Sequence, residues 1–130
     1  MIKISILLQL ELGDLPPSVN QMYRTGRNGN RYKRAEVSEW QDSVSRIMRE
    51  ARNNQPPYMG EVEVHVIFRV ANNRKWDVDN RLKALFDCLE KGRVIKGDSQ
   101  IWGVVACRVK GENSGTIIKV KEYTGKIKKS

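Results

Sequence analysis

Apolar and polar residues alternate along several stretches of the chain. Residues 2–10 place isoleucine or leucine at every second position, with polar side chains filling most of the positions between. A two-residue period is typical of a half-buried β-strand. Residues 61–70 alternate in the same way and predict a second strand. Residues 100–110 and 116–123 are apolar and β-branched on either side of the turn sequence GENSG, which predicts a hairpin.

Two other stretches follow the helical period. In residues 35–53 the apolar side chains recur every three or four positions, which predicts an amphipathic helix. A second helix is predicted from Asp79 to Lys91. The order of elements indicates an α/β fold, with a mixed sheet of about four strands packed by two helices. A chain of 130 residues has the length of one domain, so we expect residues 1–130 to form a single unit.

Both kinds of periodicity vanish between residues 13 and 34. This stretch contains Pro16-Pro17 and Asn28-Gly29, which break regular structure, and interleaves arginines with tyrosines. Such a long loop in a compact domain is usually functional or disordered. Residues 125–130 form a second basic segment, predicted to be a mobile tail.

The charge balance indicates a polyanionic partner. Lys and Arg number 24 against 15 Asp and Glu, giving a formal net charge of +9 and a pI near 9.8. Such a surface favours nucleic acid through phosphate contacts and counterion release. The N-terminus lacks the pattern of a signal peptide and no stretch is long enough to cross a membrane, so we expect a cytoplasmic protein without a membrane partner. Cys88 and Cys107 are interpreted as reduced thiols, because they lack the spacing and the histidines of a zinc site.

Acidic residues nevertheless gather around the start of the second predicted helix. Asp77 and Asp79 lie two positions apart, Lys83 and Asp87 follow on one helical face, and Asp98 precedes the third strand. A single acid at a helix start is explained as an N-terminal cap. Several converging carboxylates would instead repel one another unless a cation lay between them, and Mg²⁺ prefers such oxygen ligands.

Other metal and nucleotide templates do not fit. A calcium loop beginning at Asp77 would need glycine at its sixth position, where Leu82 stands. The one histidine, His65, excludes most histidine-metal nucleases. The P-loop pattern is absent, so no nucleotide cofactor is expected.

Three motifs together resemble a known family. The run DVDNRLKALFD at residues 77–87, Asp98 within GDSQI, and PPSVNQMYR at residues 16–24 resemble the RusA family of Holliday junction resolvases, often encoded by phages. The resemblance spans residues 6–123. It implies a RusA-like fold, a homodimer, and a Mg²⁺-dependent endodeoxyribonuclease of DNA recombination and repair that resolves four-way junctions by paired nicks. Mn²⁺ is the alternative ion.

The resemblance also implies residue roles. Asp77, Asp79 and Asp98 would bind the metal, Lys83 would be the catalytic lysine, and Asn80 and Asp87 would support them. The family often carries a second acid before the third aspartate, where this chain has Gly97. The residues expected to contact DNA are Asn20, Tyr23, Arg24, Arg27, Arg31, Lys33 and Arg34.

Two other functions remain open from the sequence. The chain is alternatively a noncatalytic nucleic-acid-binding module in which the aspartates only cap a helix, or a degenerate relative that binds junctions without cutting them. Both alternatives predict binding that does not depend on Mg²⁺, whereas the nuclease hypothesis predicts cleavage that Asp→Asn changes abolish.

Overall fold

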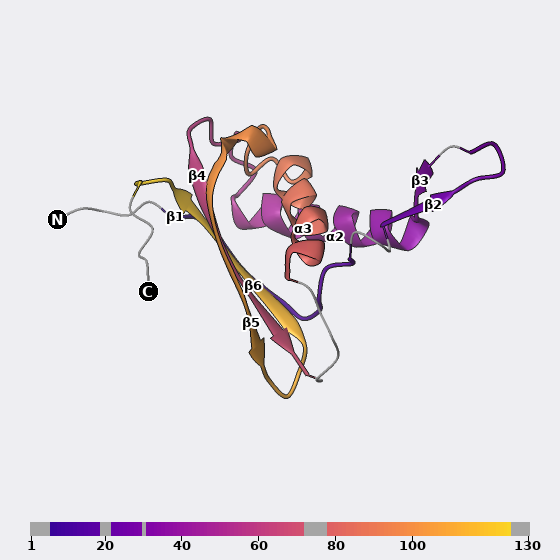
Figure 1. Cartoon of the computed structure of the whole chain (residues 1–130). Helices are drawn as coiled ribbons and strands as arrows, with labels where there is room; N and C mark the ends of the chain where they lie inside the picture. The colour runs from indigo at the N-terminus through magenta and orange to yellow at the C-terminus, as the bar shows by residue number, and fades with distance from the viewer. Residues whose placement is uncertain (1–5, 19–21, 30, 72–77, 126–130) are drawn as a thin grey trace.

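A four-stranded sheet forms the body of the protein (Figure 1). The structure is a computed structural model that describes residues 6–18, 22–29, 31–71 and 78–125. The strands lie in the order β1-β6-β4-β5. Their bounds are Ile6–Leu12 for β1, Val62–Val70 for β4, Ile101–Lys110 for β5 and Gly115–Glu122 for β6.

The sheet is mixed, as predicted. β4 and β5 are parallel, and helix α3 (Val78–Lys91) lies between them in the chain, because parallel neighbours need a crossover. β6 runs antiparallel to both β4 and β1. The α/β fold with two helices and a four-stranded mixed sheet is therefore confirmed.

The predicted hairpin of the last two strands is wrong. β5 and β6 form as strands, but β4 lies between them and pairs with both. β4 is buried at most of its positions. A strand that is largely buried is most stable at the centre of a sheet, where a neighbouring strand pairs with each of its edges. The connecting turn passes over the end of β4, where the Gly111 amide donates to the Val70 carbonyl at 3.2 Å.

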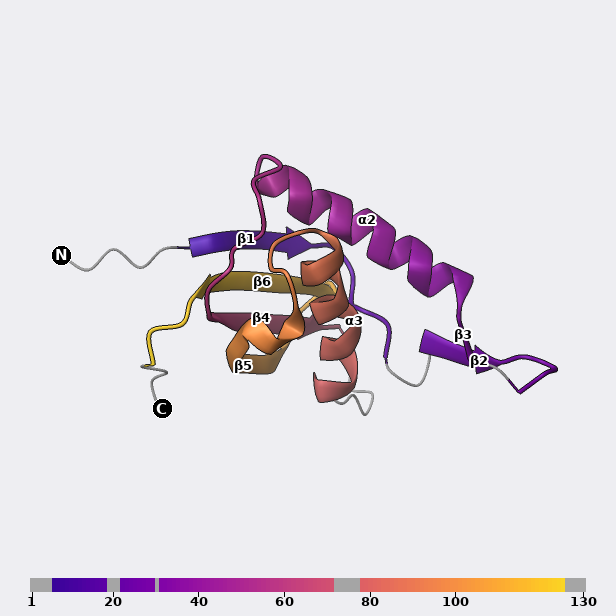
Figure 2. The same ribbon diagram turned by 90° about the horizontal axis from the view of Figure 1, so that it is seen from above.

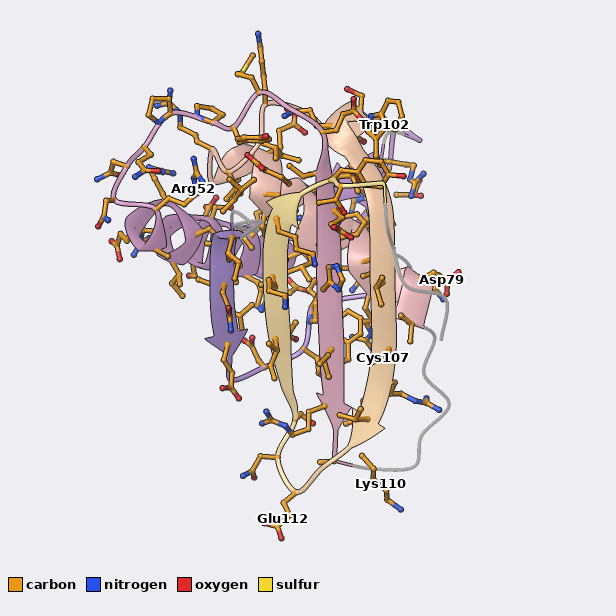
Figure 3. The ribbon with its side chains drawn as sticks, turned by 90° about the vertical axis from the view of Figure 1, so that its left-hand side faces the viewer. Arg52, Asp79, Trp102, Cys107, Lys110 and Glu112 are labelled. Carbon is orange, nitrogen blue, oxygen red and sulfur yellow. The ribbon has the colours of Figure 1, made fainter. Side chains whose placement is uncertain are left out.

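Both helices cover the same face of the sheet (Figure 2). Helix α2 (Ala35–Ala51) matches the predicted helix closely. Within the described residues, the opposite face carries no helix, and it faces the viewer in Figure 3. The side chains that fill the space between sheet and helices include Met48, Val64, Phe68, Leu85 and Leu89, all fully buried.

The first strand differs from its prediction in position. β1 runs to Leu12, and residues 1–5 lie outside the described residues. Leu8 and Leu12 are buried, whereas Ile6, predicted to share their face, is 52% exposed. An irregularity in the pairing with β6 lies between Ile6 and Leu8, and it breaks the alternation there.

The basic stretch 13–34 is more ordered than an irregular loop. It contains a two-stranded hairpin, β2 (Tyr23–Thr25) and β3 (Arg31–Lys33), that projects beyond the N-terminal end of α2 (Figures 1 and 2). Gly29, with φ of +82°, takes the left-handed conformation that the turn requires. The base of the hairpin is closed by the Arg34 amide, which donates to the Met22 carbonyl at 2.9 Å.

Candidate active site

The first turn of α3 presents Asp79 to solvent. The helix begins at Val78, so Asp79 lies inside the first turn, where its charge interacts favourably with the positive end of the helix dipole. Figure 3 shows Asp79 at the exposed end of α3. Asp77 lies outside the described residues, so its predicted metal-binding and capping roles both stay predictions.

Lys83 and Asp87 form an ion pair on the exposed face of α3. Lys83 Nζ lies 3.1 Å from Asp87 Oδ1, one helical turn further along. This hydrogen bond and the Asp87 charge raise the pKa of Lys83 above its ordinary value of 10.5. Partial burial opposes them, while Tyr23 and Asp98 add smaller contributions that also raise the pKa. Lys83 therefore lies within electrostatic reach of both the hairpin and the third predicted aspartate.

Asp98 is the first residue of a short 3-10 helix, η1 (Asp98–Gln100), that directly precedes β5. Its side chain is exposed, and η1 contacts α3. The crossover connection thus returns the chain from α3 to a position where Asp98 influences Lys83. Asp98 therefore lies within electrostatic reach of Lys83, although the two residues are distant in the sequence.

Gln100 fixes the turn that carries Asp98. Its Oε1 accepts hydrogen bonds from the amides of Lys96 at 2.7 Å and Gly97 at 3.0 Å. Its Nε2 donates to the carbonyls of Tyr58 at 2.6 Å and Gly60 at 2.9 Å. One side chain therefore ties the η1 turn to a segment some forty residues earlier in the sequence.

Gly97, the departure from the family pattern, is not required by the backbone. Its φ of −161° is extended, a conformation that any residue adopts. A Cβ built there would meet only Ser99 Oγ, at 4.0 Å. The fold therefore has room for an acid at this position, although this chain lacks one.

The donor chemistry at α3 and η1 fits a hard divalent cation. Asp79 and Asp98 are exposed carboxylates, and neither forms an ion pair within the described residues. Carboxylate oxygens are the ligands that Mg²⁺ takes. Among residues 6–18, 22–29, 31–71 and 78–125, no three acidic, histidine or cysteine side chains come close enough to hold a metal ion. The third predicted ligand, Asp77, is not among those residues.

The hairpin places part of the predicted DNA-contact set beside α3. Tyr23 packs partly buried against Met22 and Ala84, and the Arg31 guanidinium lies 4.7 Å above the Tyr23 ring. Such a cation–π contact stiffens the hairpin. The other predicted contacts Arg27, Lys33 and Arg34 are exposed on or beside the hairpin, whereas Asn20 and the side chain of Arg24 lie outside what the structure describes. Asn80, a predicted supporting residue, is partly buried in the first turn of α3.

The proline motif is attached directly to α3. The Arg81 guanidinium donates to the Pro16 carbonyl at 2.7 Å, and Pro17 lines a pocket of about 220 Å³ with Arg34 and Val37. Burial lowers the pKa of Arg81 below its ordinary value. Two separate sequence motifs of the resemblance are therefore neighbours in space, a relationship that their spacing in the chain does not indicate.

The sequence comparisons identify the family. Residues 14–121 match the family model described as Endodeoxyribonuclease RusA, a range that includes the proline motif, α3 and Asp98. The chain belongs to the RusA family. A crossover junction endodeoxyribonuclease RusA from Aquifex aeolicus (strain VF5) is 30% identical over 118 residues, covering 89% of this chain and 92% of the relative.

Further RusA relatives come from a bacterium and a phage. The crossover junction endodeoxyribonuclease RusA of Escherichia coli (strain K12) is 34% identical over 86 residues, or 66% of this chain and 70% of the relative. The protein of that name from Enterobacteria phage 82 is 33% identical over the same length. No helix in the described part of this RusA-family chain has the length and apolar character to cross a membrane.

Proposed function

We propose that this RusA-family chain is a crossover junction endodeoxyribonuclease that cuts four-way DNA junctions. The names of its relatives and the family match support the reaction class. The observation that carries the proposal for this chain is the position of Lys83. It is paired with Asp87, lies within electrostatic reach of Asp98 and Tyr23, and stands on the helix whose first turn carries Asp79.

Asp77, Asp79 and Asp98 are the proposed ligands of a Mg²⁺ ion, with Mn²⁺ as the alternative. Bound there, such an ion supplies an activated water and offsets negative charge on the phosphoryl oxygens. The chain contributes by holding the carboxylates of Asp79 and Asp98 on two different elements, α3 and η1, which contact each other. Gln100 holds the backbone turn that carries the second of these carboxylates through four hydrogen bonds to main-chain atoms.

Lys83 acts as a cation in this proposal and not as a base. A lysine with the ordinary pKa of 10.5 is an ammonium ion throughout the neutral range, and Asp87 raises the pKa of Lys83 further. An ammonium group donates to a phosphoryl oxygen as a compact point charge. Asp87 meanwhile restricts where that charge can lie, since the two side chains are hydrogen bonded.

The hairpin is the proposed DNA-contact surface. Arg27, Arg31, Lys33 and Arg34 bring positive charge to the hairpin, whose Tyr23 packs against the cluster that contains Ala84 of α3. Cationic side chains bind phosphates without reading sequence, so they attract the polyanion that the aspartates alone would repel. Tyr23 offers an aromatic ring beside Lys83 for contact with an opened crossover.

A twofold substrate favours a twofold enzyme. A four-way junction has two equivalent strands to cut, and a homodimer with one site in each subunit is the simplest way to make paired nicks.

We also propose that the protein works in the cytoplasm, which the free thiols of Cys88 and Cys107 support.

A direct test uses a synthetic four-way junction labelled on each arm in turn, with a linear duplex of the same sequence as control. The proposal predicts nicks at symmetry-related positions in opposite strands of the junction, present with Mg²⁺ and absent with a chelator. The noncatalytic alternative predicts binding without nicks under both conditions.

A further inference from the structure

A buried amide side chain lies in the contact between the two helices. The face that α2 turns toward α3 is otherwise formed by small or apolar side chains such as Val37 and Val44, yet Gln41 lies there only 1% exposed. Its Nε2 donates to the carbonyl of Ala84 on α3 at 3.1 Å. A buried amide is costly unless its polar atoms find partners, so this position is held by specific hydrogen bonds.

The other end of the same amide reaches the hairpin. Gln41 Oε1 accepts a hydrogen bond from Lys33 Nζ at 2.8 Å, on strand β3. A continuous chain of hydrogen bonds therefore runs from Lys33 through Gln41 to Ala84. Because the donor is an ammonium, the first link is charge-assisted and stronger than a neutral hydrogen bond.

This chain ends beside Lys83. Ala84 follows Lys83 directly in α3 and is fully buried in a small cluster with Met22 at the base of the hairpin. The Tyr23 side chain packs against the same cluster and contributes to the raised pKa of Lys83. A displacement of the hairpin relative to α3 would therefore move the DNA-contact surface relative to Lys83.

We propose that Gln41 is a positioning residue that couples the hairpin to the catalytic helix, an inference that rests on the proposed function. The Lys33–Gln41–Ala84 link fixes the distance between the phosphates held by the hairpin and the ammonium group of Lys83. The other cationic side chains of the hairpin do not depend on Gln41. Loss of the link therefore leaves junction binding largely intact and misplaces the scissile phosphate. A misplacement of the reacting group by about 1 Å lowers the rate by roughly tenfold to a hundredfold.

The test compares Gln41→Met, Lys33→Met and the double variant. Single-turnover cleavage is measured at saturating protein, and junction affinity is measured by fluorescence anisotropy without a divalent ion. We expect each single change to lower the cleavage rate about tenfold or more. The dissociation constant of Gln41→Met should stay within about threefold of the wild-type value, whereas Lys33→Met also removes a proposed phosphate contact and should bind the junction more weakly. The double variant should cut no more slowly than the slower single variant, because both changes break one link.

Three further variants separate positioning from stability. Ser45→Ala changes another buried polar residue of α2, one turn further along, and should cut as the wild type does. Lys33→Arg keeps a donor for Gln41 and should restore much of the rate. Gln41→Glu keeps the acceptor for Lys33 but cannot donate to Ala84 when ionised, and should be as slow as Gln41→Met. Thermal unfolding of every variant checks the fold, and exposed Lys33 gives a variant that does not disturb the core.

The outcomes are distinguishable. A wild-type cleavage rate in Gln41→Met would overturn the coupling. So would a loss of cleavage in Gln41→Met that its loss of affinity fully explains. A double variant whose rate decrease equals the product of the two single decreases would overturn it as well. A wild-type protein that cuts no junction would instead refute the proposed nuclease function.

Discussion

Lys83 Nζ and Asp87 Oδ1 lie 3.1 Å apart on the exposed face of α3, so the proposed catalytic cation is held by its own helix. The pairing needs no other element, because residues four apart in a helix are neighbours. It restricts the location of the ammonium group before DNA arrives and raises its pKa further above neutral pH.

The Asp87→Asn change should lower the pKa of Lys83 toward its ordinary value of 10.5. Titration followed by the ¹³Cε chemical shift of Lys83 measures this directly. Because the folded pKa lies above the unfolded one, the pair stabilises the native state at pH values below the unfolded pKa, and this contribution is lost as pH rises through the folded pKa. An unchanged pKa in Asp87→Asn would show that the ion pair does not form in solution.

Gln100→Ala should weaken metal binding at Asp98. Four backbone hydrogen bonds hold the η1 turn, and losing an outer partner of a ligand costs about tenfold to a hundredfold in metal affinity. Isothermal titration with Mn²⁺ measures the affinity, and exposed Gln9 on β1 provides the control Gln9→Ala. Equal affinity in Gln100→Ala and the wild type would remove Gln100 from the site.

Removing charge from the hairpin should flatten the salt dependence of junction binding. The double change Arg27→Gln, Arg31→Gln is expected to reduce the slope of log K against log salt by about 0.9 for each phosphate that the variant no longer neutralises. The matched control is Arg46→Gln, Arg49→Gln, which removes the same charge from exposed positions on α2. Parallel slopes in the two double variants would mean that the hairpin binds no phosphates and that net charge alone governs binding.

The two cysteines should differ sharply in reactivity. Cys88 is fully buried, and this burial raises the pKa of its thiol to about 12, whereas Cys107 is exposed on β5. At pH 8 a thiol reagent should modify Cys107 quickly in the native protein and should modify Cys88 only when the protein unfolds. Because the unfolded thiol ionises near 9.0, Cys88 should lower the stability of the protein as pH rises from about 9 to 12.

The parts of the site that depend on local sequence were predictable. Helical spacing placed Lys83 and Asp87 on one face, and the periodicity of α2, β4 and α3 gave their bounds within two residues. These features depend on near neighbours in the chain, so the sequence carries them directly.

The parts that depend on chain topology were not predictable from the pattern. The sequence of β5 and β6 resembles a hairpin because the two strands are adjacent in the chain. The many buried positions of β4, which lies between them with a partner strand on each edge, explain why it separates them. The hydrogen bonds of Gln100 to the loop before β4 span some forty residues, and no periodicity signals them. Gln41 did leave a signal, since it is a polar residue one turn after Val37 on the buried face of α2.

The central claim is tested most directly by Asp79→Asn in a single assay of binding and cleavage on a labelled four-way junction with Mg²⁺. The control is Glu112→Gln, another exposed acid, on the turn between β5 and β6 (Figure 3). We expect Asp79→Asn to bind the junction at least as tightly as the wild type and to cut it at least about a hundredfold more slowly, with Glu112→Gln unchanged. Nicking by Asp79→Asn at the wild-type rate would contradict the account.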